Sequence, residues 1–115
     1  MFRDDLLMRQ IRQLAEAIAK ALGVVAEGRA AQAEGEFDAL CGQHTGLGLR
    51  TLAAMPLPQL RLMATTSEGL DPVKALTLAT LLDGAAELYG RPELTERAAA
   101  LRALSLQSDP SLSEG

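Results

Sequence analysis

Residues 70–90 read LDPVKALTLATLLDGAAELYG, and this stretch decides the fold. Asp71 followed by Pro72 is a strong signal for the start of a helix. An aspartate caps the free backbone N–H groups of the first turn, and proline suits the first helical position. Gly90 is the residue expected just beyond the last turn, where the backbone adopts a left-handed conformation. We therefore predict a helix over residues 72–89.

The sides of this helix are unusually apolar. Its polar positions form one narrow line, which runs through Lys74, Thr77, Thr80, Gly84 and Glu87. Leu76, Leu81 and Leu88 lie on the two flanks of that line, where a surface helix normally carries polar side chains. Such a helix is either central in its fold or partly covered by a partner. The three flank leucines are therefore candidates for an interaction surface.

Leucine and alanine dominate the rest of the chain as well. The 115 residues include 22 Leu and 20 Ala, against 3 Val and 2 Ile. Leucine and alanine favour helices, whereas strands favour β-branched and aromatic residues, so an all-β fold is excluded and a βαβ architecture is disfavoured. The length suits one domain. We expect a single all-α domain over residues 1–104, built from five or six helices, and a frayed tail over residues 105–115.

The N-terminal helix is expected to begin near Asp4 or Asp5 and to stop at Gly28. Its apolar residues recur at spacings of four and three, as in the seam of a coiled coil: Leu7, Ile11, Leu14, Ile18, Ala21 and Val25. We expect this seam to pack against the rest of the chain, and pairing with a second copy is the alternative. The first four seam residues, from Leu7 to Ile18, join the candidate interaction surface.

Glycine and proline divide the chain between these two helices. Gly35 predicts a turn at residues 34–36, because an interior glycine weakens a helix, and a second break is expected at residues 45–48. Short helices are predicted over residues 49–55 and 58–63, the second opened by Pro58, with a loop over residues 65–69. Pro92 opens the last helix, whose inner face comprises Leu94, Ala98, Leu101 and Leu104.

Two segments resemble the tetratricopeptide repeat, a helical hairpin that binds proteins. Residues 35–40 are similar to the turn of that repeat, with Gly35 at the bend and Phe37 two residues later. In the second segment, Leu82, Ala85 and Gly90 fall at the spacings of the repeat's Leu, Ala and Gly.

The chain as a whole resembles a family of small bacterial helical proteins of unknown function. The resemblance is carried by residues 2–11, FRDDLLMRQI, and by a later set: Leu70, Asp71, Pro72, Leu76, Leu78, Ala79 and Leu82. It covers most of residues 2–104. It implies a fold of tetratricopeptide-like antiparallel hairpins, and it implies no activity and no binding residues.

The charge balance and the cysteine count exclude several classes of function. With 15 acidic and 11 basic residues the net charge is −4, so the chain lacks the basic field that holds nucleic acid. No apolar stretch approaches the ~18 residues of a membrane span. The single cysteine excludes an internal disulfide and fits a reducing compartment. We expect a cytoplasmic protein that binds neither nucleic acid nor membrane.

The only cysteine and the only histidine, Cys41 and His44, stand one helical turn apart, with Asp38 and Glu34 on the preceding turns. These residue types match half of a zinc site completed across a dimer, or a redox sensor. A structural zinc site needs four ligands, however, and cysteine is commonly an ordinary core residue. Packing is therefore the favoured interpretation of Cys41, and we predict no catalytic site, no metal and no cofactor.

These observations predict a non-catalytic helical adaptor or scaffold that binds a protein or peptide. The alternative is a homodimeric structural or regulatory subunit, in which the partner is a second copy of the chain. A remote alternative is a metal or redox sensor that uses Cys41 and His44.

Overall fold

The computed structural model describes residues 2–26 and 28–110, and the side chains of residues 8–25 and 28–110. This part of the chain holds six helices and one short hairpin: α1 (Phe2–Ala26), α2 (Ala30–Thr45), α3 (Leu49–Ala54), α4 (Leu57–Met63), β1 (Thr65–Thr66), β2 (Gly69–Leu70), α5 (Pro72–Tyr89) and α6 (Pro92–Ser108). The prediction of an all-α fold with five to six helices is confirmed. Of the helices described, none is both long enough and apolar enough to span a bilayer.

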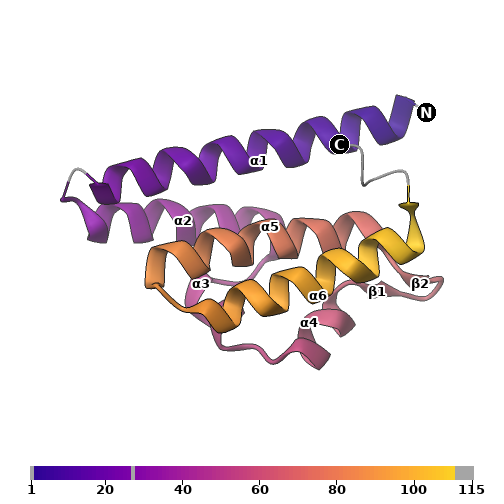
Figure 1. Cartoon of the computed structure of the whole chain (residues 1–115). Coiled ribbons are helices and arrows are strands. Elements are labelled where there is room, and N and C mark those ends of the chain that lie inside the picture. The colour runs from indigo at the N-terminus through magenta and orange to yellow at the C-terminus, as the bar shows by residue number, and fades with distance from the viewer. Residues whose placement is uncertain (1, 27, 111–115) are drawn as a thin grey trace.

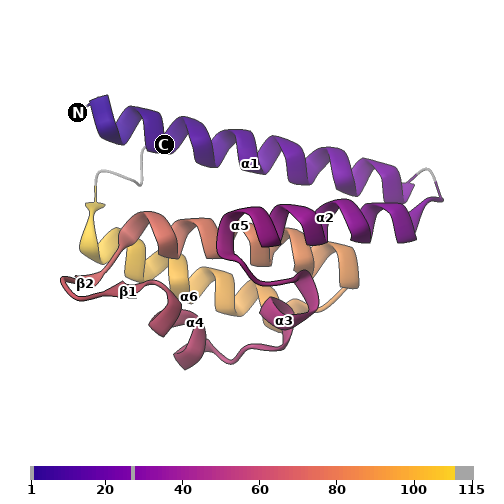
Figure 2. The same cartoon turned by 180° about the vertical axis from the view of Figure 1, so that it is seen from behind.

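The helices form two antiparallel pairs, with the short helices on one side (Figures 1 and 2). The first pair is α1 with α2, and the second is α5 with α6. Helix α5 also contacts α1, α2, α3 and α4, so it lies at the centre of the fold. Its central position explains why three of its sides are apolar.

The two ends of α5 are set by the residues that predicted them. The side chain of Asp71 accepts hydrogen bonds from the backbone N–H groups of Val73 and Lys74, at 2.9 and 3.3 Å. At the other end, Gly90 has a φ of +64° and its N–H donates to the carbonyl of Ala86. The predicted helix over residues 72–89 is therefore confirmed at both ends.

The prediction that the flank leucines of α5 face a partner is wrong for two of the three. Leu81 is 1 % exposed and Leu76 is 9 % exposed, and both are buried by the chain itself. Leu88 is partly buried and packs against the core. The cause is the enclosure of α5, since α6 runs along it and four other helices contact it.

The turn predicted at residues 34–36 is also wrong. Helix α2 passes through Gly35 without a break, so residues 35–40 form no tetratricopeptide-like turn. Ala33, Phe37 and Cys41 have no exposed surface and hold one face of the helix in the core. Burial of a phenylalanine side chain alone contributes about 1.5–3 kcal/mol, which exceeds the ~1 kcal/mol by which one glycine weakens a helix. The predicted break at residues 45–48 is confirmed, with Gly46 at a φ of +78°.

The boundary predicted at residue 104 is wrong as well, because α6 continues to Ser108. Ser105 is fully buried, and its hydroxyl donates to the carbonyl oxygen of Pro72 at 2.7 Å. This contact ties the last turns of α6 to the start of α5. Residues 111–115 of the predicted tail lie outside the described part of the chain.

The link between α4 and α5 is a hairpin of two-residue strands, in the region where a loop is predicted. Thr65 pairs with Leu70, and Thr66 pairs with Gly69. The N–H of Asp71 then donates to the carbonyl of Ala64 at 2.7 Å and closes the base of the hairpin. This closure brings the end of α4 close to the first turn of α5.

Candidate functional site

A hollow in the described surface lies where α1 extends past the end of α2. Helix α1 has 25 residues and its antiparallel partner α2 has 16, so the N-terminal part of α1 has no α2 beside it. The first turns of α5 lie beneath this part of α1. The three helices enclose a hollow of about 450 Å³, a volume within the range of small-ligand and peptide sites.

The lining of this first hollow is half apolar and half polar. The apolar side chains are Ile11, Leu14, Ala17, Leu40 and Val73. The polar side chains are Gln10, Gln13, Gln43, His44 and Thr77. They come from α1, α2 and α5, so no single helix builds the hollow.

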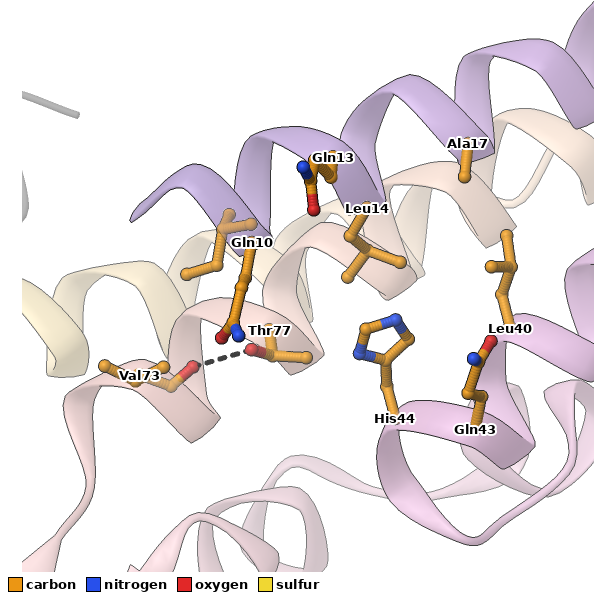
Figure 3. A pocket seen from close by; sticks show the side chains of 10 residues that line it. Gln10, Gln13, Leu14, Ala17, Leu40, Gln43, His44, Val73 and Thr77 are labelled. Carbon is orange, nitrogen blue, oxygen red and sulfur yellow. Dashed lines mark hydrogen bonds between the residues drawn. The ribbon is translucent and has the colours of Figure 1, made fainter. Parts of the chain in front are cut away.

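His44 lies in the middle of the hollow (Figure 3). It follows Phe37 by seven residues, or two helical turns, and therefore lies on the inner face of α2. Phe37 is fully buried, whereas His44 belongs to the last turn of α2 and remains exposed. Its ring points upward from the end of α2 toward α1, below Leu14. A side chain that the helical pattern assigns to the core thus reaches an open hollow.

Most hydrogen-bonding side chains of the first hollow have no partner within the described part of the chain. The hydroxyl of Thr77 donates to the carbonyl of Val73 at 2.8 Å, which leaves its lone pairs free to accept (Figure 3). The side-chain amides of Gln10, Gln13 and Gln43 make no hydrogen bond within the described part of the chain. Each glutamine amide both donates and accepts, so the hollow offers both kinds of group to an incoming molecule.

A second hollow of about 350 Å³ adjoins the first. It shares His44, Val73 and Thr77 with the first hollow and adds four residues: Thr45, Met63, Lys74 and Leu78. We call the two hollows together the α1–α5 groove. It runs from the overhanging part of α1 to the end of α4.

Charge distinguishes the α1–α5 groove from the rest of the molecule. Among the side chains that the structure describes, no aspartate or glutamate lines either hollow. The ionisable groups in the described lining are Lys74 and His44. The ammonium group of Lys74 forms no ion pair with any residue that the structure describes.

A third hollow, of about 330 Å³, lies beside a more C-terminal part of α1 and has a different character. Its lining includes Asp83, Glu87 and Arg102, and Arg102 pairs with Asp83 at 2.8 Å. Its acidic and basic groups therefore neutralise each other in part. In this respect it differs from the α1–α5 groove, whose described lining has no carboxylate.

The predicted interaction surface is only partly found on the outside of the molecule. Leu14 and Ile18 are 3 % and 5 % exposed and pack in the core. This part of the α1 seam therefore packs against the rest of the same chain, as expected. Ile11 is partly exposed and lines the α1–α5 groove. The side chain of Leu7 lies outside the described residues.

The four residues of the predicted half-site for a metal are not brought together. Asp38 accepts a hydrogen bond from the N–H of Leu49 at 2.8 Å, and Glu34 pairs with Arg50 at 3.1 Å. The described residues contain no group of three or more potential metal ligands.

Cys41 is fully buried. Burial, and to a lesser degree the charge of Asp38, raises the pKa of the Cys41 thiol to about 12. The thiol is therefore protonated at neutral pH and is neither a nucleophile nor a metal ligand in this state. The packing interpretation of Cys41 agrees with this geometry.

Sequence reasoning missed most of the polar lining of the groove. Gln10, Gln13 and Gln43 were ordinary surface residues in the helical pattern, and Lys74 belonged to the polar line of α5. The available signal was the difference in length between the first two helices. A long apolar seam beside a shorter partner helix predicts an uncovered end.

Comparisons with protein-family models, with curated proteins and with solved structures find no match to this chain.

Proposed function

We propose that this protein is a non-catalytic helical interaction module, an adaptor or scaffold, whose partner binds in the α1–α5 groove. One observation carries the proposal: the groove combines apolar side chains with amides that make no hydrogen bond within the described chain. Binding sites combine apolar surface, which supplies contact area, with polar groups that fix the orientation of the ligand, and this groove is more polar than most.

Catalysis is not part of the proposal. A cysteine nucleophile needs a thiolate within hydrogen-bond reach of its base. Here the Cys41 thiol is buried and protonated, whereas His44 opens to the groove. The same facts count against the sensor alternative, because a redox-sensing cysteine is exposed and has a lowered pKa.

Photocrosslinking in the source cells tests the proposal. A photoreactive amino acid replaces Gln13 in the groove, and in a separate variant it replaces Gln32. Gln32 is an exposed glutamine on α2, about 16 Å along the helix from Gln43 and outside both hollows. We expect one discrete adduct with another protein from the Gln13 position and none from the Gln32 position.

Two results would count against the adaptor function. Equal adducts from both positions would show that the groove is not a preferred contact. An adduct with the mass of two chains would favour the homodimer alternative, which light scattering at micromolar concentration then checks independently.

A further inference from the structure

The charges of the α1–α5 groove indicate which kind of partner it accepts. The chain carries a net charge of −4, yet the described lining of the groove includes the cation Lys74 and no carboxylate. At physiological ionic strength charges are screened over about 8 Å, so a bound segment responds to these local groups more than to the net charge. The local field favours an acidic side chain beside Lys74.

Lys74 is available for such a contact. Several cations of the described chain have acidic partners, as in the pairs Arg50–Glu34, Arg91–Glu93 and Arg102–Asp83. Lys74 has no such partner within the described chain, and its side chain borders the second hollow. An incoming carboxylate therefore gains an ion pair without breaking an existing one.

The amides of the groove indicate that the partner presents its backbone. Gln10 and Gln13 on α1 and Gln43 on α2 surround the first hollow. The N–H and C=O groups of a peptide in extended form are all available to such amides, whereas those of a helix are already paired along its axis. An extended peptide also alternates its side chains, so that every second one faces the groove.

The size of the groove excludes a folded partner that binds there alone. A stable interface between folded proteins buries about 800 Å² on each side. Two adjoining hollows of about 450 and 350 Å³ offer a smaller contact surface than that. A short extended segment can instead place one side chain in each of the two adjoining hollows.

From these observations we propose that the α1–α5 groove binds an extended segment of a partner protein in which apolar and acidic side chains recur. An apolar side chain enters the first hollow against Ile11, Leu40 and Val73, and a carboxylate meets Lys74 and His44 in the second. This inference rests on the proposed function and adds the chemistry of the partner to it.

Peptide titration of the full chain tests the inference. The probes are acetyl-LDLEL-amide, acetyl-LNLQL-amide and acetyl-LKLKL-amide, which share their apolar residues and differ in charge. Backbone NMR shifts of the ¹⁵N-labelled protein report both the affinity and the location of binding. We expect the acidic peptide to bind about tenfold more tightly than the basic one, because an exposed ion pair with Lys74 favours the acidic peptide a few-fold and repulsion by Lys74 disfavours the basic one a few-fold. The shifts should concentrate around His44, Val73 and Thr77.

The two lysines of the chain provide matched variants. Lys74→Gln should weaken binding of the acidic peptide about two- to fivefold and leave the affinity for the neutral peptide unchanged. Lys20→Gln removes the same charge from an exposed position of α1 outside the groove, and it should change neither affinity.

Three results would overturn the inference. The first is equal affinity for the three peptides. The second is equal weakening by the two lysine variants. The third is no binding of the acidic peptide at millimolar concentration. If any of these occurs while Gln13 still gives its photo-adduct, the adaptor function stands and only the partner chemistry is wrong. If the adduct is also absent, the adaptor function fails as well.

Discussion

Gly84 is a position of α5 where the packing leaves no room for a side chain. A Cβ atom there would lie 2.6 Å from Cγ2 of Ile18 and 2.6 Å from Cε2 of Phe37. Both neighbours belong to the core, so α1 or α2 would have to move. We expect Gly84→Ala to lower the free energy of unfolding by about 1–2 kcal/mol, because overpacking outweighs the better helix propensity of alanine. Urea denaturation measures the change.

The matched control is Gly35→Ala, the same substitution on an exposed side of α2. No atom lies within 4 Å of the added Cβ there. We expect this variant to be more stable than the native chain by about 0.5–1 kcal/mol, since alanine loses less backbone entropy in a helix. Changes of the same sign in both variants would contradict the close approach at Gly84.

The buried thiol of Cys41 makes a second prediction at the residue scale. Because its pKa is raised to about 12, we expect it to resist a thiol-specific reagent at pH 8 in the folded chain. Labelling should follow the fraction unfolded as urea is added. Complete labelling of the native chain within minutes would show that the thiol is accessible.

The raised pKa also links Cys41 to stability at high pH. The unfolded thiol ionises near its ordinary value of 9.0, whereas the folded thiol keeps its proton to about pH 12. Above pH 9 the unfolded state therefore binds fewer protons than the folded state, and stability falls as the pH rises. Cys41→Ala should show a smaller loss of stability between pH 8 and pH 10.

At the scale of elements, the end of α6 is held by one buried hydroxyl. Ser105 donates to the carbonyl of Pro72, the first residue of α5, at 2.7 Å. We expect Ser105→Ala to lower the free energy of unfolding by about 1 kcal/mol, the usual contribution of such a hydrogen bond. Ser108→Ala, at an exposed position three residues later, should stay within about 0.5 kcal/mol of the native chain. Equal effects of the two variants would show that the Ser105 contact adds no stability.

The elements that the sequence predicts correctly are those with local signals. Asp71, Pro72 and Gly90 define α5 through hydrogen bonds and backbone angles within a few residues of each end. Such signals do not depend on the rest of the fold. The helices opened by Pro58 and Pro92 follow the same logic.

The elements that the sequence predicts wrongly are those decided by distant contacts. Gly35 looks like a turn locally, but the neighbouring Phe37 is buried between helices and keeps α2 continuous. Ser105 looks like the start of a polar tail, but its partner Pro72 lies 33 residues away in the sequence. The groove belongs to this class as well, because it exists only where α2 ends and α5 begins beside the middle of α1.

At the scale of the whole molecule, the core and the groove share the buried side chains of Leu14 and Leu78 and are otherwise distinct. The core runs along α5 and is enclosed by the other helices, whereas the groove lies at the end of the α1–α2 pair. Leu76 and Leu81, which the sequence suggested as partner contacts, belong to the core. Apart from Leu14 and Leu78, the described groove side chains are polar or partly exposed, so they contribute less to the stability of the fold than core side chains do.

This separation predicts that binding and stability can be changed independently. The double variant Gln13→Ala/Lys74→Gln alters two exposed groove residues and should melt within about 2 °C of the native chain, because surface substitutions change stability by about 0.5 kcal/mol or less. Leu14→Ala, next to Gln13 but only 3 % exposed, should lower the free energy of unfolding by about 2–4 kcal/mol and the Tm by about 10 °C. Thermal denaturation followed by circular dichroism compares them. If the double variant melts as early as Leu14→Ala, Gln13 and Lys74 stabilise the fold about as much as a core leucine does, and the prediction is wrong. Equal Tm values for the double variant and the native chain would instead mean that these polar side chains are not needed to hold the structure, which leaves them available for recognition.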